Sequence, residues 1–97
     1  MTPEQKATFD LKALVVQGAK ISWEIPHAEQ RAIERDVPKF EAERIVRFGV
    51  VTRIDTEPTG QSRWRISGSD SDGRPVDVVV KPVGRTLRVV TVIRTDR

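Results

Sequence analysis

The apolar residues change their spacing at Gly49, and this change limits the possible folds more than any other feature of the sequence. Before Gly49 they recur mainly every three or four residues, as Ala7, Leu11 and Leu14 do, which is the period of an amphipathic helix. After Gly49 apolar and polar residues alternate, which is the period of a strand with one buried face. The sequence therefore predicts helices in the first half of the chain and a sheet in the second.

The first half carries the start and stop signals of two to three helices. Thr2, Pro3 and Gln5 predict a first helix that begins with a capping box, and Gly18 predicts its end. Two further helices are expected, from Pro26 to about Asp36 and from Pro38 to Gly49. On the third helix Phe40, Ile45 and Val46 are expected to face inward. Val37 and Phe48 are expected to help pack this helix against the rest of the domain.

The second half predicts four strands joined by short turns. The run Val78-Val79-Val80 is continuous enough to lie in the middle of a sheet, and short connections make neighbouring strands antiparallel. Residues 21–25 also alternate, as a short edge strand or an extended lead-in does. The four expected strands are Val50–Thr56, Ser62–Ser67, Pro75–Val83 and Thr86–Thr95.

These elements predict a single α+β domain over residues 1–97. Only the helices are available to cover the sheet, so they must pack on one of its faces. The expected architecture is two to three N-terminal helices on one face of a four-stranded antiparallel sheet, with or without one short edge strand.

Composition excludes several classes of function. The chain has no cysteine, so disulfides and thiolate chemistry are excluded. With one histidine and no cysteine, a structural zinc site is not expected, nor is any other metal or cofactor. No apolar run approaches the roughly 18 residues of a membrane helix, and the first residues do not read as a secretion signal. We therefore expect a cytoplasmic protein without a membrane partner. Nothing in the sequence sets the oligomeric state.

The net charge of +3 is placed unevenly. Residues 1–48 hold eight Lys/Arg and eight Asp/Glu, whereas residues 49–97 hold nine and six. Eight of those nine cations are arginines, whose guanidinium forks match phosphate or carboxylate oxygens two at a time. An arginine-rich sheet favours an anionic partner, and the alternative is a well-mixed solvated surface.

His27, Arg31 and Arg35 are spaced four residues apart on the expected second helix, so they form one row. The row combines a group that exchanges a proton near pH 7 with two fixed cations. Neighbouring cations favour neutral histidine, which suits a general base. The alternative is an ordinary exposed helix face, on which Glu34 pairs with an arginine.

Arg63 and Arg65 are two residues apart on the expected second strand and share a face, with Trp64 and Ile66 on the other. If the tryptophan faces the helices, both arginines lie on the open side of the sheet, where they suit a phosphodiester. The alternative is that they keep the sheet from aggregating.

Thr91 interrupts an otherwise apolar row on the last strand. Strict alternation predicts that Leu87, Val89, Thr91 and Ile93 share one face, and that Arg88, Val90, Val92 and Arg94 share the other. The hydroxyl of Thr91 is either a donor at a site on the sheet or an internally bonded group in the strand.

Several short motifs also occur together in a set order. They are His27-Ala28-x-x-Arg31-x-x-x-Arg35, Arg63-Trp64-Arg65-Ile66-Ser67-Gly68, Asp72-Gly73-Arg74-Pro75-Val76 and Val89-Val90-Thr91-Val92. In this order and spacing the chain resembles, over roughly residues 21–95, the family called domain of unknown function 4258. The resemblance implies a RelE-like, barnase-like toxin fold, shared with BrnT-type toxins, in which helices pack on an antiparallel sheet.

The resemblance further implies metal-independent RNA cleavage, in which a ribose 2′-hydroxyl attacks the adjacent phosphate. In that scheme His27 is the acid/base, Arg31 and Arg63 clamp the phosphate, and Thr91 positions it. Arg35 and Arg65 are further RNA-binding candidates. The implied partners are RNA and an antitoxin protein. If His27 and Arg63 do not approach a common concave surface, this mechanism loses most of its support.

The chain also departs from a strongly basic ribosome-dependent toxin, because its charge is mild and it has no lysine cluster. A second hypothesis therefore stands beside the first. In it the chain is a catalytically silent module that keeps the fold and binds nucleic acid or an acidic protein through its arginines.

Overall fold

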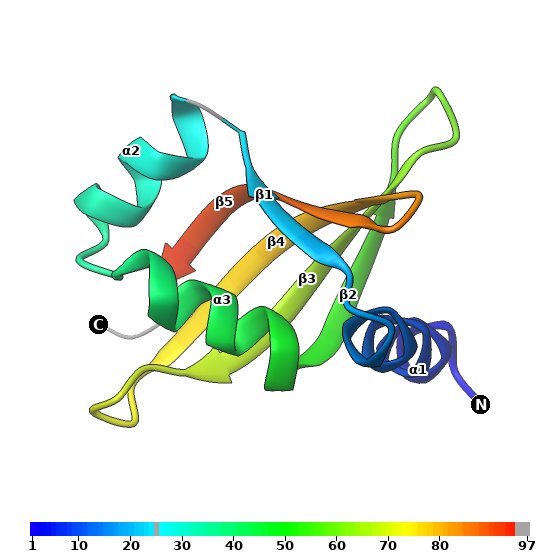
Figure 1. The fold of residues 1–97 in the computed structure, drawn as a ribbon, viewed down its shortest axis with the longest axis horizontal. Coiled ribbons are helices and arrows are strands. Elements are labelled where there is room, and N and C mark those ends of the chain that lie inside the picture. The colour runs from blue at the N-terminus through cyan, green and yellow to red at the C-terminus, as the bar shows by residue number, and fades with distance from the viewer. Residues whose placement is uncertain (25, 95–97) are drawn as a thin grey trace.

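The computed structural model describes residues 1–24 and 26–94, and this part of the chain contains three helices and five strands (Figure 1). In chain order they are α1 (Pro3–Val16), β1 (Lys20–Trp23), α2 (His27–Glu34), α3 (Lys39–Phe48), β2 (Val50–Thr56), β3 (Ser62–Ser69), β4 (Pro75–Val83) and β5 (Thr86–Arg94). The fold is α+β, as the spacing of apolar residues predicts. Thr95 and Ile25, which the sequence places at strand ends, lie outside the described residues.

Local signals set the helix ends. The capping box of α1 is confirmed, because the backbone N–H of Gln5 donates to Thr2 Oγ1 at 3.1 Å and that of Thr2 donates to Gln5 Oε1 at 2.9 Å. Pro38 precedes α3 and Gly49 follows it. A Cβ atom on Gly49 would lie 2.6 Å from Ile45 O and 2.6 Å from Ile66 Cγ2, so only glycine allows α3 to run directly into β2.

The sheet has the order β1-β5-β4-β3-β2, which puts β4 and its valine run in the centre. The four strands after Gly49 pair with one another in antiparallel orientation, as predicted. The prediction of a purely antiparallel sheet is wrong in one respect, since β1 is a fifth strand and pairs in parallel with β5. Two helices and three strands separate β1 from β5 in the chain, so no tight turn dictates their relative direction.

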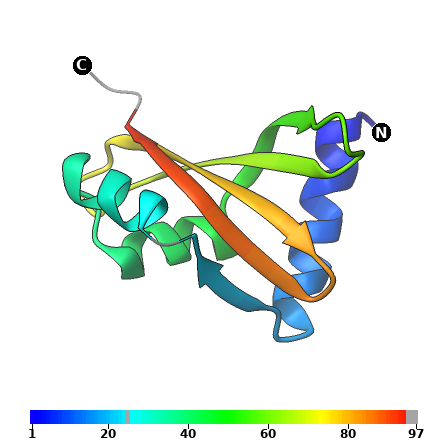
Figure 2. The ribbon, with the colours of Figure 1, turned by 90° about the horizontal axis from the view of Figure 1, so that it is seen from above.

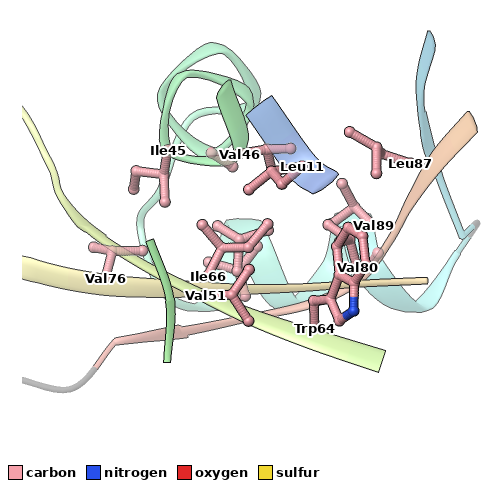
Figure 3. Packing of buried hydrophobic residues seen from close by; sticks show 14 of the residues in the cluster. Leu11, Ile45, Val46, Val51, Trp64, Ile66, Val76, Val80, Leu87 and Val89 are labelled. Atoms are coloured by element: carbon pink, nitrogen blue, oxygen red, sulfur yellow. The ribbon is translucent and has the colours of Figure 1, made fainter. Parts of the chain in front are cut away.

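The helices pack on one face of this sheet and bury a single apolar cluster (Figures 1 and 2). Trp64 and Ile66 of β3 point into the cluster, together with Leu11 of α1 and Val46 of α3 (Figure 3). Two expected inward residues are instead exposed, since Phe40 is 70% and Phe48 75% accessible. The reason is helical geometry, because the inward stripe of α3 runs through Ala42, Ile45 and Val46 at spacings of three and four.

A bulge in β5 overturns the predicted division of its side chains. Val80 pairs with Val89 while Val79 pairs with Thr91, so Val90 is an extra residue and the alternation shifts by one. Val92 is therefore fully buried with the core, although strict alternation placed it on the opposite face from Val89. Thr91 and Ile93 move to the face opposite the helices. The bulge could not be predicted from the sequence, because valine occurs at positions 89, 90 and 92 and suits either face of the strand.

The connection between β3 and β4 is organised by the buried carboxylate of Asp70. Its Oδ1 accepts 2.9 Å hydrogen bonds from the backbone N–H groups of Asp72 and Arg74, and its Oδ2 lies 3.1 Å from Arg94 Nη1. The backbone hydrogen bond from Arg74 is the main cause that lowers the pKa of Asp70 to about 2, and the Arg94 guanidinium contributes. The ionised carboxylate thus ties the turn to the end of β5.

We predict that Gly49→Ala destabilises the protein by about 1–3 kcal/mol, because the added methyl group clashes with backbone and core atoms that are already packed. The free energy of unfolding in urea measures this. Ser69→Ala, an exposed substitution nearby, should change it by less than about 0.5 kcal/mol. Equal stability of wild type and Gly49→Ala would show that the α3–β2 junction is not as tight as described.

We also predict an acid-sensitive contribution from Asp70. Its pKa is about 2 in the folded protein and about 3.9 in an unfolded chain, so its stabilising effect is fully present above pH 4 and is lost as the pH falls towards 2. Unfolding free energies measured across this range should fall more steeply for wild type than for Asp70→Asn. Asp72→Asn, on the exposed side of the same loop, should keep the wild-type slope. A slope unaltered by Asp70→Asn would contradict the assignment.

Candidate nucleic-acid interface

In the view of Figure 2, α3 lies below the strands and α2 lies beside their left ends. The face of the sheet opposite the core has no helix over it among the described residues. We call it the open face. Because Trp64 and Ile66 are buried against the helices, Arg63 and Arg65 must project from the open face, as the sequence predicts. Strand registers place further polar residues beside them. Ser22 pairs with Arg88, and Arg88 pairs with Lys81. Because Trp64 pairs with Val80 in antiparallel orientation, Arg63 lies opposite Lys81, and Arg63 pairs in turn with Asp55. These residues therefore lie in one row across the sheet.

Arg63 and Arg65, the two arginines predicted on the second strand to bind phosphate, each form an ion pair with a carboxylate. Arg63 Nε lies 2.7 Å from Glu57 Oε1, and Arg65 Nε lies 2.6 Å from Asp77 Oδ2. Lys81 shares Glu57 at 3.0 Å, and the hydrogen bonds from Arg63 and then Lys81 lower the pKa of the Glu57 carboxyl. A phosphate that binds either arginine must therefore compete with a charge-assisted hydrogen bond already made.

Thr91 reaches the open face because of the bulge in β5. It pairs with Val79, which in turn pairs with Arg65, so Thr91 and Arg65 lie on the same face two strands apart, or about 10 Å. Strict alternation had grouped Thr91 with Leu87 and Val89, which are buried. The structure thus brings together Arg63, Arg65 and Thr91 on one surface.

The row formed by His27, Arg31 and Arg35 belongs to the helical layer. His27 is the first residue of α2 and is exposed, while Ala28 and Ala32 of the same helix are buried in the core. Glu34 Oε2 accepts from both arginines, at 3.0 Å from Arg31 Nη1 and 3.4 Å from Arg35 Nη1. One carboxylate therefore neutralises part of the charge of this row.

The structure does not bring His27 and Arg63 together. The helix that carries His27 contacts β5 from the core side, whereas Arg63 projects from the opposite face of β3. In the sheet order β4 and β5 separate β3 from the β1 edge that leads into α2. The two halves of the cleavage site implied by the resemblance thus lie on different sides of the sheet.

Sequence reasoning missed four cations of the open face, Lys20, Arg53, Lys81 and Arg88. Ile21 and Trp23 pack against the core, so Lys20 and Ser22, which alternate with them, face the open side. Arg88 lies between the buried Leu87 and Val89. Alternation was a usable signal for Lys81 and Arg88, but Lys20 joins this surface only because β1 pairs with β5.

No group of three or more His, Asp or Glu side chains suited to hold a metal occurs in the part of the chain that the structure describes. Within the same residues, none of the helices has the length and apolarity needed to cross a membrane.

Comparison with known proteins gives one match. The model of the family described as Domain of unknown function (DUF4258) matches residues 26–94, from the start of α2 to the end of β5. No curated protein and no solved structure matches the chain.

Proposed function

This chain belongs to the DUF4258 family, and we propose that it is an RNA-binding domain whose open face meets the phosphate backbone. The observation that carries the proposal is the charge of that face. Cations outnumber carboxylates on it, and phosphate contacts supply most of the affinity of nucleic-acid-binding proteins. The cations are Lys20, Arg53, Arg63, Arg65, Lys81 and Arg88, and the carboxylates are Asp55, Glu57 and Asp77.

The positions of the aromatic residues support recognition of the backbone rather than of bases. Trp64 is buried in the core, Trp23 packs against it, and the three phenylalanines lie on helices. Within residues 1–24 and 26–94 the open face therefore offers no aromatic side chain for base stacking, which is the usual source of affinity for unpaired bases. Hydroxyl groups such as those of Ser22 and Thr91 add neutral donors to phosphate oxygens. Binding of this kind is tolerant of sequence and depends on salt.

The finer assignment is part of the same proposal. We propose that the fold is of the RelE-like, BrnT-like type, which agrees with helices on one face of a mainly antiparallel sheet. The protein then acts on RNA in the cytoplasm, and an antitoxin protein is its regulatory partner.

Cleavage of RNA is the second candidate function, and the exposure of His27 favours it. The only histidine of the chain stands accessible at the start of α2, with Arg31 and Arg35 on the same helix row. In this scheme neutral His27 takes a proton from a ribose 2′-hydroxyl, whose oxygen attacks the adjacent phosphorus while Arg31 stabilises the charge that develops. The bond from phosphorus to the 5′-oxygen of the next nucleotide breaks, and the protonated histidine gives its proton to that leaving oxygen, which leaves a 2′,3′-cyclic phosphate. Arg63 cannot assist on that surface, so the arginines of α2 must supply the positive charge.

RNA binding is expected to weaken steeply with salt. For a fluorescent single-stranded RNA, the logarithm of the binding constant should fall linearly with the logarithm of salt concentration, by about 0.7 for each phosphate contact. Fluorescence anisotropy over a series of salt concentrations measures the slope, and RNAs of equal length and different sequence should give similar values. Absent binding, or binding that salt leaves unchanged, would refute the RNA-binding proposal.

Cleavage is tested separately, with purified protein and RNA in EDTA. If His27 is the acid/base, wild type cleaves without metal and His27→Ala is slower by about 10²–10⁴-fold. Gln30→Ala, an exposed substitution on the same helix, should cleave like wild type. An inactive wild type, or equal cleavage by His27→Ala, would rule out this mechanism and leave RNA binding unaffected.

A further inference from the structure

Almost every lysine and arginine side chain in residues 1–24 and 26–94 makes an ion pair or a hydrogen bond. The exceptions are Lys20, Arg85 and Arg88, all of which are exposed. The contrast with Arg63 and Arg65 is clear, because their side chains are only 39% and 29% accessible and each holds a carboxylate.

The three exceptions lie at one corner of the sheet. The backbone N–H of Lys20 donates to Arg85 O at 3.1 Å, so the start of β1 adjoins the turn between β4 and β5 (Figures 1 and 2). Lys20 pairs with Thr86, and Ser22 pairs with Arg88. Residues directly opposite on neighbouring strands have Cα atoms about 5 Å apart, so the backbones of Lys20, Arg85 and Arg88 lie close together.

The positive charges of Lys20, Arg85 and Arg88 lie close together, and none of the three has a carboxylate partner among the described residues. Arg88 also pairs with Lys81 on β4, and two cations placed directly opposite each other on neighbouring strands repel. Lys81 is balanced by Glu57, which also serves Arg63, but no carboxylate of the described chain lies within ion-pair distance of Arg88. A bound anion would reduce this repulsion. It could bind these guanidinium and ammonium groups directly, because no carboxylate has to be displaced from them first.

We infer that Lys20, Arg85 and Arg88, with the hydroxyls of Ser22 and Thr86, form the principal phosphate-binding subsite, at the corner where the open face meets the turn between β4 and β5. The inference rests on the proposed RNA binding and assigns its strongest contacts. Arginine forks supply bidentate hydrogen bonds to a phosphate and the lysine supplies a point charge. Arg63 and Arg65 contribute less, because a phosphate must displace Glu57 or Asp77 to reach them. The subsite joins two parts of the chain, since Lys20 and Ser22 precede the segment that matches the family.

The test compares variants that remove equal charge from different places. The subsite variant is K20Q/R85Q/R88Q, and the matched control is K6Q/R44Q/R47Q on α1 and α3. The subsite variant should lose about tenfold or more in RNA affinity and show a salt slope smaller by about 2, whereas the control should stay close to wild type. R63Q/R65Q, which removes two charges instead of three, should lose less affinity per charge removed than the subsite variant.

Equal losses in the subsite variant and the matched control would overturn the subsite and leave general RNA binding in place. Thermal unfolding separates function from structure, because removing unpaired like charges should leave the midpoint of the subsite variant unchanged or higher. A lower midpoint would mean that the three side chains serve the fold, against the inference.

Pyrophosphate provides a probe that does not depend on RNA binding. Added to ¹⁵N-labelled wild type, it should shift the amide signals of residues 20–22 and 85–88 before those of residues 63–65. The absence of such shifts would contradict the subsite directly. If they appear in a protein that binds no RNA, the subsite stands as an anion site and the proposed function fails. If an acidic protein and not RNA competes with pyrophosphate, the nucleic-acid assignment is overturned.

Discussion

One face of the sheet is buried under the helices, and the remaining features of the molecule follow from this constraint. Strand side chains alternate, so the burial of Trp64 and Ile66 forces Arg63 and Arg65 to the other side. The same parity sends Lys20 and Arg88 outward, because Ile21 and Leu87 pack inward. Charge thus accumulates on the open face as a consequence of core packing. The carboxylates of Glu57 and Asp77 offset only part of it.

Local sequence signals predicted much of the fold and less of the site. The change of period at Gly49, the capping box at Thr2 and the central valine run are short-range features, and the structure has each of them. The parallel pairing of β1 and the bulge at Val90 depend on which segments meet in space, and alternation cannot encode either. The orientation of Arg63 was predictable from local sequence, because it alternates with the buried Trp64 on β3. Its ion pair with Glu57 was not, because the partner lies six residues away across a turn.

The separation of α2 from the open face divides the possible functions between two surfaces. His27 lies on α2, in the helical layer, and histidine is the side chain suited to proton exchange near pH 7. The two arginines on the same helix, Arg31 and Arg35, share the carboxylate of Glu34, so part of their charge is already neutralised. The open face has the greater charge and, in the part of the chain that the structure describes, no histidine, so it is suited to binding and not to acid/base chemistry near pH 7. An enzyme built on this fold would have to bring RNA to α2, whereas a binding module needs only the open face.

Chemical-shift mapping with single-stranded RNA on ¹⁵N-labelled protein tests the central claim most directly, because each backbone amide reports its own surroundings. We expect the largest shifts in β1, in β5 near Arg88 and in the turn between β4 and β5, and small shifts in α1 and α3. Shifts confined to α2, with the sheet unchanged, would contradict the account and would move the functional surface to the row headed by His27.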